Sequence, residues 1–211
     1  MKSYGPKALI LIGQETVIAR QIRILRECYP QARFVVVAGF EADKVRRSLP
    51  ADVHVFVNPD FEVTNVAKSI EIGLYQTDYE TPALVVYGDL VFNRQAVDGL
   101  PLDRSSVVID TSGSSREQEV GVNVVGGRAM CFSYGLPQKW AHVCLLTERE
   151  KRLFIHAAQV GYRKRFFGYE ILNEVIDNGG VLDAVAPQGM RLVEIDCSKD
   201  IEKARRIDLS S

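Results

Sequence analysis

Short apolar runs alternate with amphipathic segments along the first half of the chain, and this alternation restricts the fold more than any other feature. The runs at 7–12, 33–38, 53–57 and 83–87 are nearly uninterrupted. Such runs are typical of strands buried on both faces of a parallel sheet. Segments with helical spacing, such as 16–29, separate them. The pattern predicts right-handed βαβ units in an α/β fold.

The second half of the chain predicts a more mixed arrangement. Runs at 120–125 and 128–132 flank Gly126-Gly127 and predict a hairpin, and the polar segment 111–119 predicts a mobile surface loop. The remaining predicted elements are strands at 107–110, 141–146, 181–186 and 191–195 and helices at 148–160, 169–177 and 200–207. Because no repeat or linker interrupts this series, we expect one domain over 1–211, with a mixed, mostly parallel sheet flanked by helices.

Composition excludes several classes of partner. The chain has 211 residues, a hydrophobic content of 46% and a formal net charge of -1, which argues against nucleic acid and anionic membranes as partners. No apolar run approaches the roughly 20 residues that cross a bilayer. The four cysteines form no CxxC pair, which favours reduced thiols over a disulfide framework or a zinc site. We therefore expect a cytoplasmic protein.

A first acidic candidate follows the apolar run at 83–87. Gly88 allows a sharp turn there, and Asp89 comes at the end of the predicted strand. Open α/β sheets bind ligands along this edge, and a carboxylate suits a divalent cation that bridges to phosphate oxygens. The alternative is that Asp89 only caps the following turn.

A second acid repeats this arrangement near the end of the chain. Asp196 follows the strand predicted at 191–195 and precedes a helix that contains Asp200. Two carboxylates, water and substrate phosphates make an octahedral Mg²⁺ site. If Asp89 and Asp196 share one ion, their side chains lie within about 6 Å of each other. The alternative is that Asp196 caps its helix while Asp200 offsets the helix dipole.

Several segments together carry a family resemblance. They are GQETVIARQIRIL at 13–25, VVVAGFEADKV at 35–45, NVAKSIEIGL at 65–74, Gly88-Asp89, Tyr169-Glu170, and the acidic block at 194–196 with Asp200. In this order and spacing the chain resembles sugar-nucleotidyltransferase-like proteins, especially bacterial choline-phosphate cytidylyltransferases. The resemblance runs over nearly the whole chain and implies a Rossmann-like GT-A nucleotidyltransferase fold.

The resemblance also implies a reaction. A phosphate oxygen of a small acceptor, such as a phospho-alcohol or sugar phosphate, attacks the α-phosphorus of a nucleoside triphosphate, with CTP favoured, and pyrophosphate leaves. Asp89 and Asp196 are then the catalytic residues and the Mg²⁺ ligands. The resemblance places the nucleotide near Gly13, Gln14, Asn65, Ser69 and Gly88.

Aromatic residues supply candidates for acceptor binding. Trp140 with Tyr134 and Tyr169 is able to frame a cationic headgroup through cation–π contacts, and Glu170 is a further candidate. The alternative is that these aromatic residues pack in the core.

One departure from the family is large. The family's glycine-rich loop after the first strand, G-x-G-x-R, is absent, because Gly13 leads at once into Gln14-Glu15-Thr16. Either the run at 7–12 replaces the first strand, which we favour, or the chain starts after that strand and its loop. On the favoured interpretation Lys7 lies at the wrong end of the strand for catalysis.

The missing loop keeps a second function open, that of a binding or assembly protein that has lost catalysis. A glycosyltransferase is a third alternative, but the usual D-x-D is not present, because Leu90-Val91 follows Asp89. The hairpin residues Val122, Val124, Met130 and Phe132 need a cover, and we therefore also predict a homodimer.

Overall fold

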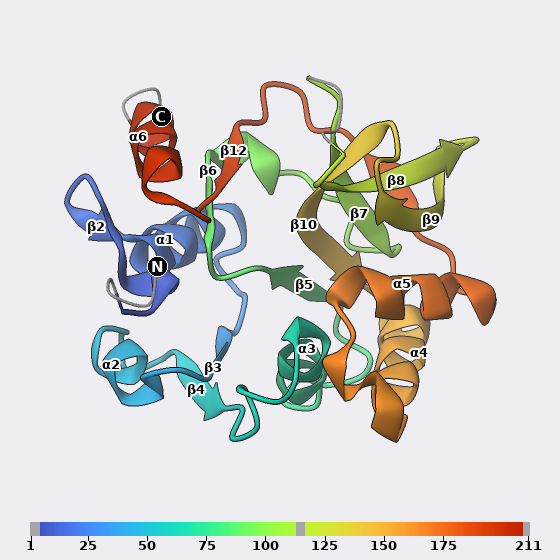
Figure 1. Ribbon diagram of the computed structural model, residues 1–211, viewed down its shortest axis with the longest axis horizontal. Coiled ribbons are helices and arrows are strands. Elements are labelled where there is room, and N and C mark those ends of the chain that lie inside the picture. The colour runs from blue at the N-terminus through green and yellow to red at the C-terminus, as the bar shows by residue number, and fades with distance from the viewer. Residues whose placement is uncertain (1–4, 113–116, 209–211) are drawn as a thin grey trace. The chain divides into compact units, whose positions relative to one another are not determined.

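The computed structural model describes residues 5–112 and 117–208 (Figure 1). The chain forms two compact units. Unit 1 consists of Met1–Val57, Val86–Gly99 and Pro187–Ser211, and unit 2 consists of Asn58–Val85 and Leu100–Ala186. Both units are built from segments that are far apart in the sequence. The single domain expected over 1–211 stays a prediction.

Unit 1 begins with a tight turn and a small hairpin. The 3₁₀ helix η2 (Lys7–Leu9) leads into strand β1 (Leu11–Ile12), which pairs with the antiparallel strand β2 (Glu15–Thr16). Gly13 adopts a φ of 62° in the turn between them, a value that glycine accepts without strain. The predicted strand at 7–12 is therefore wrong, because its first half forms a helical turn and its second half a two-residue hairpin strand.

The rest of the described part of unit 1 contains two further strand pairs and three α-helices. Strands β3 (Val35–Ala38) and β4 (His54–Val57) are parallel, whereas β6 (Leu90–Phe92) and β12 (Leu192–Glu194) are antiparallel. The helical elements are α1 (Val17–Cys28), α2 (Ala42–Arg47), the 3₁₀ helix η3 (Arg94–Ala96) and α6 (Ser198–Asp208). Thr16 caps α1, because its hydroxyl oxygen accepts a hydrogen bond from the Ala19 N–H.

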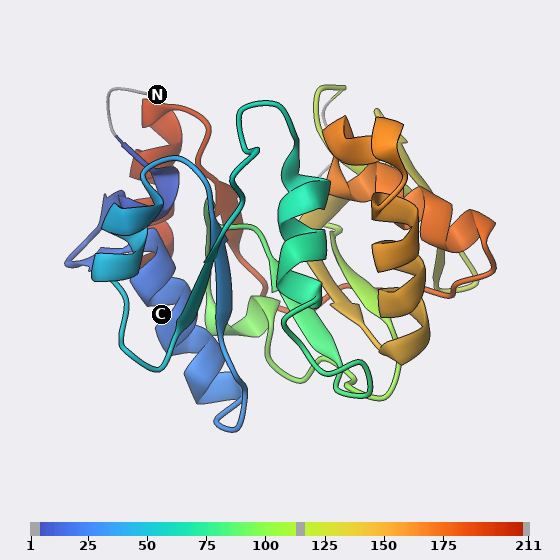
Figure 2. The ribbon, with the colours of Figure 1, turned by 90° about the horizontal axis from the view of Figure 1, so that it is seen from below.

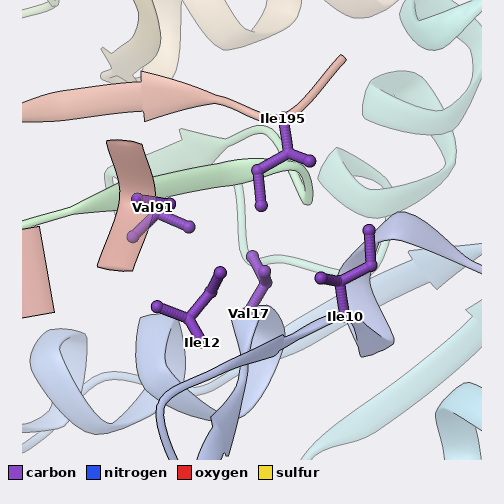
Figure 3. Close-up of a cluster of buried hydrophobic side chains, with 6 residues drawn as sticks. Ile10, Ile12, Val17, Val91 and Ile195 are labelled. Carbon is purple, nitrogen blue, oxygen red and sulfur yellow. The ribbon is translucent and has the colours of Figure 1, made fainter. Parts of the chain in front are cut away.

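A buried apolar cluster holds the separate segments of unit 1 together. It contains Ile10, Ile12, Val17, Val91, Ile195 and Ala204, of which Figure 3 labels the first five. These residues come from the first hairpin, α1, β6, the end of β12 and α6. Burial of one such aliphatic side chain contributes roughly 1.5–3 kcal/mol. This cluster therefore fixes the positions of the polar residues that lie next to its members in the sequence.

In the residues that the structure describes, unit 2 combines a mixed sheet with three α-helices. Its strands are β5 (Ala83–Val86), β7 (Ser106–Asp110), β8 (Val120–Val125), β9 (Arg128–Tyr134), β10 (Gln138–Leu146) and β11 (Asp183–Val185). Their order is β5-β10-β7-β11-β9-β8, and β8 also pairs with β10, so the pairings close a ring of five strands. The helical elements are α3 (Val66–Leu74), α4 (Glu148–Ala158), η4 (Gly161–Arg165) and α5 (Gly168–Asp177). Helices α3 and α4 lie side by side (Figure 2).

Most predicted elements of unit 2 are present. The hairpin of β8 and β9 turns at Gly126 and Gly127, which both have positive φ, as a two-residue hairpin turn requires. Its residues Val122 and Phe132 are buried by the chain itself, while Met130 is exposed. Part of the predicted mobile loop, 113–116, lies outside the described residues.

Strand β5, which precedes Asp89, differs from the prediction. All four residues of β5 are half-buried, so this strand is not buried on both faces. The fully buried strand is β6, which begins directly after Asp89. Within the described residues, no helix combines the length and the apolar character that are needed to cross a membrane.

Candidate active site

The antiparallel pairing of β6 with β12 builds an acidic cluster within unit 1. Leu90, the first residue of β6, lies opposite Glu194, the last residue of β12. The Ile195 N–H extends this pairing by donating to the Asp89 carbonyl oxygen at 2.9 Å. The start of one strand therefore lies beside the end of the other, which brings Asp89 next to the segment from Glu194 to Asp196.

Three carboxylates converge at this point. One oxygen each of Asp89, Glu194 and Asp196 lies within 4.8 Å of the other two. Ile195 between the two later acids is fully buried in the apolar cluster. Because side chains of an extended segment alternate in direction, Glu194 and Asp196 lie on the side away from that cluster. The distance meets the geometric condition for a shared ion, and the metal-binding role of Asp89 and Asp196 stays a prediction.

Lys7 joins the cluster, contrary to prediction. Its Nζ donates to Asp196 Oδ1 at 2.7 Å and to Asp89 Oδ2 at 3.3 Å. The expectation that Lys7 lies at the wrong end of a strand is wrong, because Lys7 belongs to the helical turn η2 and not to a strand. Ile10, three residues on, is buried in the apolar cluster and anchors this turn beside the acids.

The electrostatics of the cluster reflect its partial burial. Burial raises the pKa of Asp89, the charge of Glu194 raises it further, and Lys7 opposes both effects. Burial acts to lower the pKa of Lys7, but its hydrogen bond to Asp196 and the charges of Asp89 and Asp196 outweigh this, so its pKa is raised. The cluster thus keeps Lys7 charged while it disfavours the ionised form of Asp89.

Asp200 supports the segment that carries Asp196. Its Oδ2 accepts hydrogen bonds from the Asp196 N–H at 3.2 Å and the Cys197 N–H at 2.9 Å, and its Oδ1 accepts from Lys203 at 2.9 Å. Burial acts to raise the pKa of Asp200, but these hydrogen bonds hold it far below its usual range. Asp200 therefore holds the backbone at the start of α6, and the Asp196 carboxylate points to Lys7 instead.

The donor set fits a hard divalent cation. Carboxylate oxygens are the ligands that Mg²⁺ prefers, and ligands at 2.0–2.1 Å on opposite sides of one ion lie about 4.2 Å apart. Only one pair of the three oxygens is able to lie opposite, and adjacent ligands lie about 2.9 Å apart, so the oxygens, now within 4.8 Å of one another, move closer together when an ion binds. Asp89, Glu194 and Asp196 are thus able to hold Mg²⁺, with water and substrate oxygens as the other ligands.

The predicted nucleotide-binding residues occupy turns and a helix start. Gly13 and Gln14 form the exposed turn between β1 and β2, and Gly88 lies in the turn before Asp89. In unit 2, the Asn65 side chain accepts from the Val66 N–H at 2.8 Å and caps α3, while Ser69 Oγ accepts from Asn58 Nδ2 at 3.2 Å. The contacts of all five with a nucleotide stay a prediction.

The aromatic candidates in unit 2 separate into two groups. Tyr134 and Tyr169 form an edge-to-face pair with centroids 5.8 Å apart, and Phe167 stacks on Tyr169 at 5.9 Å. Burial, Glu170 and Tyr134 raise the pKa of Tyr169 to about 12. The Glu170 carboxylate accepts from the Phe167 N–H at 2.7 Å and closes the first turn of α5.

Trp140 does not belong to this group, so the predicted frame of three aromatic rings is corrected. Its side chain is only 2% exposed and packs edge-on against Phe132 and His142. The indole N–H donates to the Val143 carbonyl at 3.3 Å. Trp140 is therefore a core residue, because its ring and its polar atom are both occupied within the protein.

The sequence analysis did not single out Glu194 as a third acid of the cluster. The signal was present in Glu194-Ile195-Asp196, since a spacing of two along an extended segment puts both acids on one side. It also missed the place of Lys7, for which no local pattern gives a signal. The contact from Lys7 to Asp196 spans 189 residues of sequence.

Comparison with protein families gives a match over most of the chain. Residues 1–159 match the MobA-like NTP transferase domain. The chain belongs to this family. A MobA-like NTP transferase domain makes the protein a nucleotidyltransferase, and the predicted enzyme class and family resemblance are confirmed.

Solved structures show the same fold for this NTP transferase domain. The CTP:phosphocholine cytidylyltransferase from Streptococcus pneumoniae is 16% identical with a TM-score of 0.74, and the match covers 96% of this chain and 89% of that one. The inositol-1-phosphate CTP transferase from T. maritima is 17% identical with a TM-score of 0.75, covering 96% and 87%. A nucleoside-diphosphate-sugar pyrophosphorylase from Vibrio cholerae is 11% identical with a TM-score of 0.71, covering 95% and 91%.

These similarities confirm the predicted α/β fold of GT-A-like nucleotidyltransferases. Among curated proteins, the comparison found no match.

Proposed function

We propose that the protein transfers a nucleoside monophosphate from a nucleoside triphosphate, with CTP favoured, to a small phosphorylated acceptor in a Mg²⁺-dependent reaction. The observation that carries this proposal is the convergence of Asp89, Glu194, Asp196 and Lys7 in a chain of the NTP transferase family. Burial first, and the charge of Glu194 second, raise the pKa of Asp89, which reflects the cost of ionising Asp89 in the cluster. A divalent cation relieves it.

The reaction forms one P–O bond and breaks another. A phosphate oxygen of the acceptor attacks the α-phosphorus of the triphosphate, and the bond to the bridging oxygen breaks, so pyrophosphate leaves with the electron pair. Bound Mg²⁺ would supply charge neutralisation at the α-phosphate. Asp89, Glu194 and Asp196 would hold it, and Lys7 adds a positive charge to the same region. Positioning and charge stabilisation account for catalysis of this kind.

The choice of nucleotide and acceptor rests on the similar structures. Two of them are named as CTP-dependent enzymes, and their acceptors are phosphocholine and inositol 1-phosphate. Both acceptors are phospho-alcohols, which supports CTP and a phospho-alcohol as the first pair to test. For a cationic acceptor, Tyr134 with its neighbours Tyr169 and Phe167 offers aromatic faces for cation–π contact.

Pyrophosphate release tests the proposal. The protein is incubated with each of the common nucleoside triphosphates, Mg²⁺, and phosphocholine, inositol 1-phosphate or a sugar 1-phosphate. We expect the fastest release with CTP and a phospho-alcohol, and none without Mg²⁺. The control pair is Asp89→Ala, which removes a cluster acid, and Asp43→Ala, which removes an exposed acid on α2. Release by the wild type that is no faster than by Asp89→Ala would refute the proposal.

Calorimetry with CTP separates catalysis from the alternative of a binding protein without activity. That alternative is motivated by the missing glycine-rich loop, since each charge-assisted hydrogen bond lost to a triphosphate is worth roughly 1.5–3 kcal/mol. Tight CTP binding that requires Mg²⁺, together with pyrophosphate release, supports the enzyme. CTP binding that is independent of Mg²⁺ and without turnover supports the alternative.

The proposed homodimer rests on the β8–β9 hairpin. Val125 and Met130 are 60% and 47% exposed there. Apolar side chains at this exposure favour a covering surface, for which we propose a second copy. A dimer mass in light scattering at micromolar concentration is expected, and a monomer mass would reject the dimer.

A further inference from the structure

Gln21 lies on α1, which carries none of the acids, yet it contacts the turn that presents Asp89. Its side chain is 4% exposed. The amide Nε2 donates to the Tyr87 carbonyl oxygen at 2.9 Å and to the Leu90 carbonyl oxygen at 2.7 Å. One side-chain amide therefore uses both of its N–H donors on the two carbonyls that flank Gly88-Asp89.

The other side of the same turn is held by its own backbone and by Ile195, the residue that follows β12. The Leu90 N–H closes the turn onto the Tyr87 carbonyl at 3.4 Å, and the Asp89 carbonyl accepts from the Ile195 N–H at 2.9 Å. The backbone around Asp89 is thus held from α1 through Gln21 and from β12 through Ile195. Because Glu194 and Asp196 adjoin Ile195, these contacts set the distance between Asp89 and the other two acids.

We propose that Gln21 is a positioning residue for Asp89, which holds the Tyr87–Leu90 turn at the distance that lets the three acids share one divalent cation. This inference rests on the proposed function. Groups that orient metal ligands without touching the metal typically affect metal affinity by about 10–100-fold. The contact to the Leu90 carbonyl is buried and that to the Tyr87 carbonyl is part-buried. A buried carbonyl without a donor is costly, so loss of the amide would let the turn move until other donors, such as water, reach these carbonyls.

The test compares Gln21→Met with Ile22→Val. Methionine keeps the length of the side chain but lacks both donors. Ile22 is the next residue of α1, is equally buried, and packs in a separate apolar cluster with Ile18 and Val53. Ile22→Val therefore destabilises the helix without touching the turn. Gln21→Asn keeps the amide but shortens its reach, and provides a second variant if Gln21→Met does not fold.

Two measurements are made on each protein, and neither depends on turnover. Mn²⁺ binding, followed by the loss of the free-ion EPR signal, reports on the cluster. Hydrogen exchange of the Ile195 amide reports on its bond to the Asp89 carbonyl. We expect Gln21→Met to weaken Mn²⁺ binding about tenfold or more and to speed Ile195 exchange, with a smaller change in Gln21→Asn. Ile22→Val should change neither by more than about twofold after correction for global stability.

The failure of this inference and that of the proposed function give different results. If the wild type binds Mn²⁺ and Gln21→Met binds it with the same affinity, the positioning role alone is overturned, whether or not Ile195 exchange changes. Absence of Mn²⁺ binding in the wild type would remove the metal from the proposed function. In that case, unchanged Ile195 exchange in Gln21→Met overturns the role of Gln21 in holding the turn, and faster exchange supports it.

Discussion

The two acids that the sequence singled out reach the same place by different means. Asp89 precedes its strand, and its side chain is 23% exposed, whereas Asp196 follows its strand, and its side chain is 65% exposed. The turn at Asp89 is held by a buried amide from another helix, and the segment at Asp196 is held by Asp200, four residues on. The less exposed acid therefore depends on tertiary contacts and the more exposed acid on local ones.

This difference predicts unequal consequences of substitution. A carboxylate that is partly removed from water interacts more strongly with a nearby cation, because solvent screens the interaction less. Changes near Asp89 should therefore have larger effects than changes near Asp196. The predictions below run from the largest expected effect to the smallest.

The largest effect is expected from Asp89→Asn. It removes a charge that is less exposed than those of Lys7 and Asp196, and turnover should fall by about 10²–10³-fold, the usual cost of removing one organised electrostatic contact. The rise in melting temperature that Mg²⁺ gives the wild type should also vanish. Pyrophosphate release and thermal unfolding with and without Mg²⁺ measure both. Asp43→Asn, with the same change in charge at a 79% exposed site, should leave both unchanged.

Lys7→Met should separate metal affinity from turnover. Lys7 Nζ lies 2.7 Å from Asp196 and 3.3 Å from Asp89, so a cation bound to both must compete with it. We expect Mn²⁺ affinity to rise by roughly threefold to fivefold, in keeping with a partly exposed ion pair, while turnover falls. Lys199→Met removes an exposed lysine of α6 and serves as the control. Weaker Mn²⁺ binding in Lys7→Met would contradict competition at the cluster.

Asp200→Ala should have a smaller effect, through the backbone. It removes the acceptor of the Asp196 and Cys197 N–H groups, a loss comparable to that of a helix cap, which costs about 1 kcal/mol. We expect a lower melting temperature and a few-fold weaker Mn²⁺ binding. Glu202→Ala, an exposed acid on the same helix, is the control. If Asp200→Ala weakened Mn²⁺ binding more than Asp89→Asn does, the contrast between the two acids would be wrong.

The smallest effect is the pH dependence of stability in the metal-free protein. The pKa of Asp89 is raised in the folded state, so its contribution to stability is present below the ordinary aspartate pKa of about 3.9 and is lost as pH rises through the folded-state pKa. Asp89→Asn lacks this loss. In denaturant unfolding, Asp89→Asn should therefore be slightly more stable than the wild type near pH 7. Near pH 3 the two proteins should have about the same stability. A variant less stable near pH 7 would contradict the raised pKa.

The sequence by itself determined the local elements and the chemical type of the site. Helices α1, α4, α5 and α6 and the β8–β9 hairpin lie where helical spacing and Gly126-Gly127 predicted them. These signals are local, because each depends on residues within a few positions of one another. The acids after short apolar segments indicated a cation site for the same reason.

Only the tertiary structure decided how the site is assembled. Parallel strand ends were expected to bring Asp89 and Asp196 together, but the antiparallel pairing of β6 with β12 does so and adds Glu194. The run at 7–12 had the apolar character of a strand, yet burial of Ile10 and Ile12 against Ile195 shapes it as a turn and a hairpin strand, and this brings Lys7 to the acids. Apolar character fixes that a segment is buried, but its partner depends on packing between residues far apart in the chain.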